Sequence, residues 1–212
     1  SHRVLNTPVL GINSRPKVSV GFFCPVNGST FAPYLDAVLE GKVVPRNLLR
    51  MDAGVNGKPL CPPVLNDILY AAASPAATTH YRIKLGETEE RHRSAGIWIS
   101  TAAGSTAAIW AAGGEQVELT DDRIQFLVRE CYSPRSYGSS LCHGFFRTGL
   151  AITNLTPEAA LYMDGARIVH PLNYGDRIEA LPSASPLKIY LDQSARNRDD
   201  KPEVQTGTHL PG

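Results

Sequence analysis

The stretch that decides the fold is Ile97-Trp98-Ile99-Ser100-Thr101-Ala102-Ala103-Gly104-Ser105-Thr106-Ala107-Ala108. Its apolar beginning predicts a short β-strand, and the small residues that follow predict a turn. Residues 107–112 favour a helix of about two turns. Ser105 or Thr106 can cap this helix by accepting hydrogen bonds from backbone N–H groups, and Gly113-Gly114 ends it.

This turn is a candidate ligand loop. The N-terminus of the expected helix presents unpaired N–H groups and partial positive charge, which suit a nucleotide phosphate or a base edge. Ala102, Ala103 and Gly104 are small enough to leave the backbone open to close approach by a ligand. The alternative is that strand, turn and helix pack tightly for structural reasons alone.

Length, composition and net charge limit the classes of protein to which this chain can belong. The chain has 212 residues, 42% apolar content and a net charge of +1, which predicts one domain, or one domain with a fragment of another. The near-neutral charge gives no basic surface for nucleic acid, and no apolar run is long enough to span a membrane. Ser1-His2-Arg3-Val4 lacks a signal-peptide layout. We therefore expect a soluble cytoplasmic protein with neither nucleic acid nor membrane as a partner.

The four cysteines predict no metal site. Cys24, Cys61, Cys131 and Cys142 are widely separated and form no C-x-x-C pair, so neither a zinc ribbon nor a dense disulfide framework is indicated. We expect reduced, partly buried thiols. Cys142-His143 could pair a nucleophile with a base, but neighbours on an extended chain point to opposite faces, so no catalytic role is assigned there.

The rest of the chain predicts a mainly β fold, a sandwich of short antiparallel strands with a few short helices. Asp164-Gly165 predicts a tight two-residue hairpin turn. Residues 31–41 predict an amphipathic helix that covers a sheet edge. The expected strands are the short apolar segments between turn residues, namely 64–70, 81–85, 97–100, 124–129, 151–154, 160–163, 167–170, 177–180 and 187–191.

The N-terminal segment predicts a second, incomplete domain. Residues 7–13 are typical of a buried parallel strand, which needs neighbouring strands and crossover helices that would lie before Ser1. We expect residues 9–12 to be an orphan strand. The predicted organisation is the end of a truncated N-terminal α/β domain at 1–22, a β-rich dinucleotide-binding domain at 23–191, and a polar tail at 192–212.

Asn66-Asp67 is the second candidate motif, because these polar residues interrupt an otherwise apolar run that predicts a buried strand. Burying an amide and a carboxylate costs several kcal/mol unless each is paired, which favours a ligand or an internal network. Asp67 could accept hydrogen bonds from both hydroxyls of a ribose, and Asn66 could bond to a base edge or a hydroxyl. The alternative is a strand end or β-bulge with both side chains in solvent.

Taken together, the two motifs resemble the NAD kinase (ATP-NAD kinase) family. The resemblance runs from about residue 8 to residue 191, and within the family it is strongest to the plant-type NADH kinase branch. The stretches that carry it are 9–13, 65–69, 74–77, 96–107 and 113–114.

The resemblance implies transfer of a phosphoryl group from ATP or another nucleoside triphosphate, with Mg²⁺, to the adenosine-ribose 2′-hydroxyl of NAD or NADH. The product would be NADP or NADPH, and the enzyme would be a homo-oligomer. The implied substrate-binding residues are Asn66 and Asp67 for the dinucleotide and, for the loop against its adenosine part, Thr101, Gly104, Ser105, Thr106 and Ala107.

The sequence departs from the family pattern at several points. The family's Gly-Gly-Asp-Gly motif, whose aspartate the resemblance assigns as general base, is absent and would lie before Ser1, so no catalytic residue is assigned. Ala102 and Ala108 stand where many members have proline and tyrosine. Ala95 stands where many members have an aspartate near the nicotinamide end, which predicts that NADH is accepted. The alternative for Ala95 is that it only fills space against Trp98 or its neighbours. The alternatives are a non-catalytic dinucleotide-binding or assembly domain and a related lipid or small-molecule kinase.

Overall fold

The structure, a computed structural model, describes residues 4–18, 21–131 and 140–191. Within these ranges the chain divides into two compact units. One comprises residues 4–8 and 46–188, and the other comprises residues 9–45 and 189–191. The domain boundaries expected at residues 22 and 191 stay a prediction, and the expected polar tail at 192–212 lies outside the described residues.

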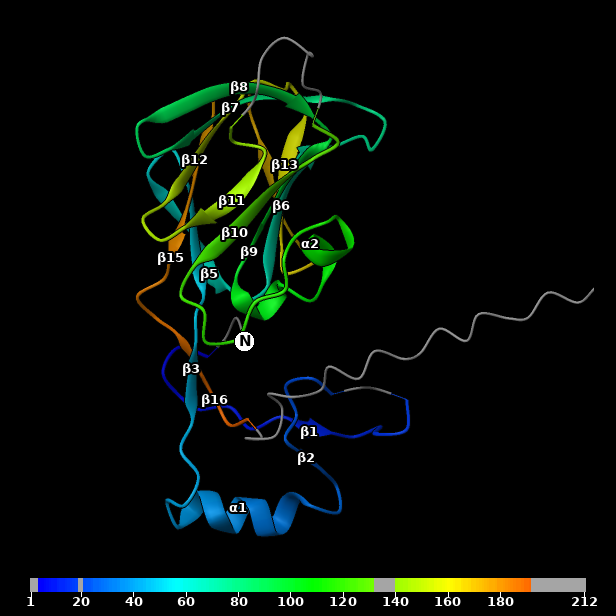
Figure 1. Cartoon of the computed structure of the whole chain (residues 1–212), viewed down its shortest axis with the longest axis vertical. Helices are drawn as coiled ribbons and strands as arrows, with labels where there is room; N and C mark the ends of the chain where they lie inside the picture. Colours follow the sequence, from blue (N-terminus) through cyan, green and yellow to red (C-terminus); the bar gives the residue numbers. More distant parts are fainter. Residues whose placement is uncertain (1–3, 19–20, 132–139, 192–212) are drawn as a thin grey trace, which may run out of the picture. The chain divides into compact units, whose positions relative to one another are not determined.

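The larger unit contains two six-stranded sheets in which all neighbouring strands are antiparallel (Figure 1). The first sheet has the order β11-β10-β9-β6-β13-β14, and the second has the order β5-β4-β15-β12-β7-β8. The first is built from β6 (Asp67–Ala72), β9 (Gly96–Ser100), β10 (Ile124–Arg129), β11 (His143–Phe146), β13 (Ala159–Met163) and β14 (Ile168–Leu172). The second is built from β4 (Met51–Val55), β5 (Lys58–Val64), β7 (Thr79–Leu85), β8 (Thr88–Ser94), β12 (Leu150–Asn154) and β15 (Arg177–Pro182).

One hydrophobic core joins the two sheets. Alternate residues of β4, namely Met51, Ala53 and Val55, are buried. Side chains of the first sheet such as Ile99 belong to the same buried cluster as side chains of the second sheet such as Ile83. The predicted β-sandwich of short antiparallel strands is therefore confirmed.

In the smaller unit, β1 (Ile12–Asn13) pairs in parallel with β2 (Val26–Asn27). Val9 forms a parallel bridge with Ile189. The parallel character expected for this segment is confirmed, but the expectation of an orphan strand is wrong because residues 9–13 find partners later in the chain. A separate two-stranded sheet consists of β3 (Arg46–Leu48) and β16 (Leu187–Ile189).

The helix predicted at 31–41 is α1 (Phe31–Leu39), and it is followed by Gly41 in the left-handed region with φ of +73°. None of its residues is buried, and Leu39 is 76% exposed. Its apolar side chains Tyr34, Leu35 and Val38 are half-buried, and the expectation that it covers a sheet edge stays a prediction. No helix among the described residues is long and apolar enough to cross a membrane.

The hairpin predicted at Asp164-Gly165 joins β13 to β14. Both residues have positive φ, +49° and +97°, as the Asp-Gly pair predicts. The connection is longer than the expected two-residue turn, because the first paired residues beyond it are Met163 and Ile168. The Asp164 side chain binds another part of the chain, as described below.

Candidate functional site

Asn66 and Asp67 lie where the chain crosses from one sheet to the other. β5 of the second sheet ends at Val64, and β6 of the first sheet begins at Asp67. The prediction that the two polar residues interrupt one buried strand is therefore wrong, since the apolar run at 62–70 contains two strands and the link between them. We call residues 65–67 the crossing link.

The turn that begins at Thr101 lies directly beside the crossing link. β6 and β9 are antiparallel neighbours, with Asp67 opposite Ser100. The Thr101 backbone N–H donates a hydrogen bond to the Asn66 carbonyl oxygen at 2.9 Å, and its hydroxyl donates to the carbonyl oxygen of Leu65. The Ser100 hydroxyl also donates to the Asn66 carbonyl, at 3.2 Å. The structure thus brings both sequence motifs together at one end of the β6–β9 pair.

The turn itself is packed against protein. Residues 102–104 form a short 3₁₀ helix, η1 (Ala102–Gly104), and all three are buried. A Cβ on Gly104 would lie closer than 3.0 Å to both the Asn66 carbonyl and the Ser100 hydroxyl. The expectation that Ala102, Ala103 and Gly104 leave the backbone open to a ligand is therefore wrong, because the space that Gly104 leaves is filled by the crossing link.

The helix after the turn is α2 (Ala108–Ala111), which lies beside β9 (Figure 1). No side chain caps its N-terminus, so the predicted cap by Ser105 or Thr106 is wrong. The Ser105 hydroxyl instead donates to the Ala102 carbonyl at 2.9 Å and accepts from the Val117 N–H at 3.2 Å. Thr106, in contrast, is exposed, as is Ala107.

The end of α2 is as predicted. Gly113 has φ of +99°, and its N–H donates to the Trp110 carbonyl while the Gly114 N–H donates to the Ile109 carbonyl. These two bonds form a Schellman motif, which satisfies the last carbonyl groups of the helix.

Asp164 holds the crossing link in place from the hairpin between β13 and β14. Its carboxylate oxygens accept hydrogen bonds from the backbone N–H groups of Leu65 at 2.9 Å, Asn66 at 2.6 Å and Asp67 at 3.3 Å. The Asp164 N–H donates in return to the Asp67 carbonyl at 2.9 Å. Sequence reasoning assigned Asp164 only to its turn, because nothing local in the sequence reveals a carboxylate that binds residues about a hundred positions earlier.

Asp67 is 7% exposed, and its carboxyl group makes no hydrogen bond within the described part of the chain. Burial, and secondarily the Asp164 carboxylate, raises its pKa from 3.8 to about 6. The alternative of a solvated strand end is therefore wrong for Asp67. The Asn66 side chain is half-buried and likewise makes no hydrogen bond to a described residue. A buried carboxyl and a neighbouring amide without protein partners can together bind hydroxyl and amide groups of a ligand.

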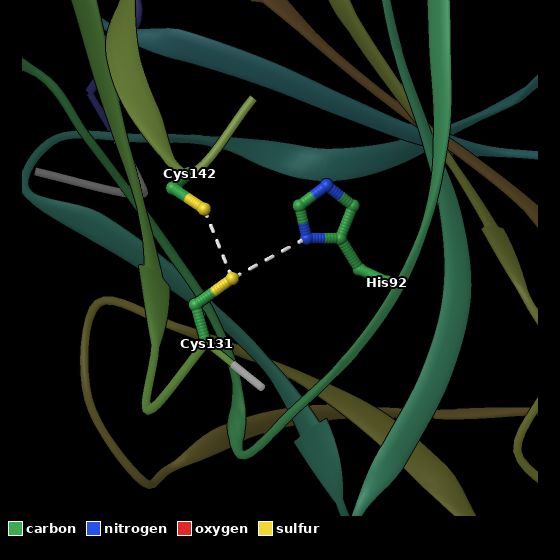
Figure 2. A group of neighbouring side chains, drawn as sticks. All are labelled: His92, Cys131 and Cys142. Carbon is green, nitrogen blue, oxygen red and sulfur yellow. Dashed lines mark hydrogen bonds between the residues drawn. The ribbon is translucent and has the colours of Figure 1, made fainter. Parts of the chain in front are cut away.

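A second cluster of chemically active side chains, shown in Figure 2, lies elsewhere in the larger unit. It consists of His92, Cys131 and Cys142, whose potential ligand atoms all lie within 4.8 Å of one another. Sequence reasoning missed this cluster because the three residues belong to segments that only the sandwich brings together. The two cysteines flanking residues 132–141 were the only available signal. His143 is exposed, so the two side chains of Cys142-His143 differ in environment.

A surface depression of about 260 Å³ lies over β7, β12 and β15 of the second sheet. Polar and charged residues from these strands, Lys84, Arg177 and Glu179, contribute to its lining. No residue of the crossing link or of the turn beside it lines this depression. The two sequence motifs and the depression are therefore separate features of the unit.

Comparisons with known proteins identify relatives of the chain. No protein-family profile matches it. It is 32% identical over 210 residues to a probable NADH kinase of Oryza sativa and 33% identical over 210 residues to an NADH kinase of Arabidopsis thaliana. Each match covers 88% of this chain and, respectively, 65% and 66% of the relative, slightly less than two thirds. The chain is similar to members of the NAD kinase family.

Solved structures of NAD kinases share its fold. A yeast NADH kinase complexed with NADH superposes with a TM-score of 0.80 at 17% identity, covering 99% of this chain and 62% of that chain. An NAD kinase from Archaeoglobus fulgidus in complex with ATP gives 0.71 at 20% identity, covering 89% and 70%. At these identities the likeness concerns the fold, and it agrees with the mainly β architecture of this chain.

Proposed function

We propose that this chain forms part of an NAD(H) kinase, which phosphorylates the adenosine-ribose 2′-hydroxyl of NAD or NADH to give NADP or NADPH. Two plant relatives named as NADH kinases support the proposal, as does the fold shared with a yeast NADH kinase complexed with NADH. The chain spans slightly less than two thirds of the length of these plant relatives, so the activity is proposed for the full-length protein.

The observation that carries the proposal is the Asp67 carboxyl group. It is almost fully buried and has no hydrogen-bond donor among the described residues, although its neighbours fix the surrounding backbone closely. A pair of vicinal ribose hydroxyls supplies the two donors that such a carboxylate lacks. Ligand hydroxyls would thus satisfy a group that the residues described by the structure leave unsatisfied.

The other proposed substrate-binding residues divide into two groups. Asn66, Thr106 and Ala107 have partly or fully exposed surfaces that can contact the dinucleotide. Thr101, Gly104 and Ser105 are buried. Thr101 would position the crossing link through its hydrogen bonds and Gly104 through close packing, and Ser105 would hold the turn through its bond to the Ala102 carbonyl. Phosphoryl transfer depends largely on positioning and charge neutralisation, so a rigid support for Asp67 suits this reaction.

ATP and Mg²⁺ are part of the proposal. An NAD kinase of the same fold is known in complex with ATP, which supports ATP as the phosphoryl donor. Mg²⁺ is held in such sites through one or two carboxylates together with substrate phosphates, and it neutralises phosphate charge. Two carboxylates lie at the crossing link. The Asp164 carboxylate accepts hydrogen bonds from backbone N–H groups, so among the described residues the Asp67 carboxylate is the one available to a ligand. Asp67 suits either a ribose or a metal-bound water, and we assign it to the ribose.

Acceptance of NADH is proposed from Ala95. This residue immediately precedes β9, at the opposite end of the strand from Thr101, and it is half-buried. Oxidised nicotinamide is cationic and reduced nicotinamide is neutral, so a carboxylate at this position would favour NAD. Alanine carries no such charge. The names of the two plant relatives agree with this preference.

The test uses the full-length protein with ATP, Mg²⁺ and either NAD or NADH, and an NADP-specific dehydrogenase detects the product. Appearance of NADP or NADPH at a rate proportional to enzyme supports the proposal. Binding of NADH in calorimetry without any product would instead favour a non-catalytic dinucleotide-binding domain. Size-exclusion chromatography with light scattering checks the proposed homo-oligomer, and fluorescence imaging of a tagged full-length protein checks the proposed cytoplasmic location.

A further inference from the structure

The cluster of His92, Cys131 and Cys142, which we call the Cys–His cluster, spans the two sheets of the sandwich. His92 lies on β8, an edge strand of the second sheet. Cys131 follows β10 closely, and Cys142 immediately precedes β11, an edge strand of the first sheet. The histidine therefore comes from one sheet, and the two cysteines come from the segments next to β10 and β11 of the other sheet.

The three potential ligand atoms face one another, as Figure 2 shows. The sulfur atoms of Cys131 and Cys142 are 2.9 Å apart, and the Cys131 sulfur lies 3.8 Å from His92 Nδ1. Sulfur atoms bound to one tetrahedral Zn²⁺ are separated by about 3.8 Å, given Zn–S bonds of about 2.3 Å. A movement of about 1 Å by one cysteine side chain would accommodate the ion.

Glu90 orients the histidine for binding. Its carboxylate lies 3.0 Å from His92 Nε2, which makes Nε2–H the donor and directs the lone pair of Nδ1 towards the sulfur atoms. Glu90 also accepts hydrogen bonds from the N–H groups of Ser140 at 2.9 Å and Leu141 at 3.3 Å. One carboxylate thus holds both the histidine and the segment that carries Cys142. A histidine ligand backed by a carboxylate is the usual arrangement in zinc sites.

The histidine is also fixed by packing. Its ring stacks on the Tyr81 ring, with centroids 5.7 Å apart and an interplanar angle of 13°. Its side chain is 2% exposed. A buried ring held by a stacking partner and a carboxylate loses little conformational freedom on binding a metal, so the site is largely preformed.

We propose that the Cys–His cluster binds one Zn²⁺ ion through His92 Nδ1 and the thiolates of Cys131 and Cys142, with water in the fourth position. Two thiolates and an imidazole select Zn²⁺ over Mg²⁺ or Ca²⁺, which prefer oxygen ligands. Binding releases two protons, one from each thiol. The ion would join the β8 edge of one sheet to the β10–β11 edge of the other.

A disulfide between the two cysteines is the chief alternative. A disulfide would involve only the two sulfur atoms. It would leave the pair of His92 and Glu90 without a role, although this pair directs a third ligand atom, His92 Nδ1, towards the sulfur atoms. The metal site uses all four side chains. The two alternatives also differ in measurable ways, since a disulfide removes two hydrogen atoms and two reactive thiols.

The direct test titrates the reduced, metal-free full-length protein with Co²⁺, which replaces Zn²⁺ and reports thiolate ligands through a charge-transfer band in the near ultraviolet. We expect the band to saturate at one Co²⁺ per chain and to disappear on addition of Zn²⁺. Elemental analysis of protein purified without chelators should give one zinc per chain. Absence of the band in protein with all thiols reduced would overturn the proposal, as would a mass lower by two hydrogen atoms in the freshly purified protein.

Variants locate the site. Cys131→Ser and Cys142→Ser should abolish the band, whereas Cys24→Ser, which changes a cysteine of the other unit, should leave it unchanged. Glu90→Gln should weaken the affinity for Zn²⁺ about tenfold to hundredfold while keeping the thiolate band. Stoichiometric cobalt binding with an unchanged band in Cys131→Ser would contradict the assignment. The wild-type titration decides the question even where a variant fails to fold.

Discussion

Gly104 and Asn66 pack so closely that a Cβ on residue 104 would stand less than 3.0 Å from the Asn66 carbonyl group. This contact joins the two motifs that the sequence separates by almost forty residues. The packing of the protein's own backbone therefore requires a small residue at position 104. The arrangement of the candidate site therefore depends on the fit between the turn and the crossing link.

Gly104→Ala should lower the free energy of unfolding, because the backbone and the Ser100 hydroxyl around residue 104 have no space for a methyl group. Overpacking of this kind costs about 1–3 kcal/mol. Chemical denaturation measures the change. Gly28→Ala is the matched control, since a Cβ there meets nothing within 4 Å, and it should change stability little. Equal stability of the two variants would contradict the packing argument.

Asp164→Ala should destabilise the protein by about 1.5–3 kcal/mol, because it leaves backbone N–H groups of the crossing link without their charged acceptor. It also places alanine at a φ of +49°. Asp164→Asn keeps an acceptor oxygen and tolerates positive φ, so it should lose less stability. Thermal or chemical denaturation compares the two variants. An alanine variant as stable as the asparagine variant would show that these hydrogen bonds contribute little.

Asp67 should make stability depend on pH between about 4 and 6. Its raised pKa, about 6 against 3.8, means that the folded protein holds this proton to higher pH than the unfolded chain does. The stabilising effect of the protonated carboxyl is present below about pH 4 and is lost as the pH rises through 6, by about 3 kcal/mol at most. Asp67→Asn should remove this loss and be the more stable protein above pH 7. Denaturation curves at several pH values test the difference, and parallel pH profiles would contradict it.

Ala95→Asp should shift preference from NADH towards NAD in the full-length enzyme. A nearby carboxylate favours the cationic nicotinamide by about 1 kcal/mol, which corresponds to about fivefold in the ratio of catalytic efficiencies. The shift is limited by Arg129, whose guanidinium lies 3.5 Å from the Ala95 carbonyl oxygen and would attract the new charge. Ala95→Asn is the control of similar size. The same ratio in both variants would show that charge at residue 95 does not set the preference.

Much of the fold could be predicted from local patterns, and the exceptions have identifiable causes. The strand β9 and the end of α2 follow directly from apolar runs and Gly113-Gly114. The edge strand β8 was missed because its sequence, TEERHRS, contains no apolar residue, although two of its side chains are buried. Without β8 the sequence could not place His92 near any cysteine.

The candidate site could be predicted only as a set of residue types. Asn66 and Asp67 stand out as polar residues in an apolar run, but their position in a link between sheets depends on tertiary structure. The burial of residues 102–104 also depends on a partner far along the chain, so local sequence could not distinguish an open ligand loop from a packed turn. Asp164 shows the same limit, because its carboxylate acts on a link about a hundred residues earlier.

Calorimetric titration of NADH into full-length wild-type protein and into the Asp67→Asn variant at about pH 7.5 tests the central claim most directly. The claim is that the buried Asp67 carboxylate accepts hydrogen bonds from the dinucleotide. Loss of a charged acceptor for ligand hydroxyls is worth about 1.5–3 kcal/mol, so the dissociation constant should rise roughly tenfold to hundredfold in a variant that remains folded. An unchanged dissociation constant would contradict the claim and remove Asp67 from the dinucleotide site.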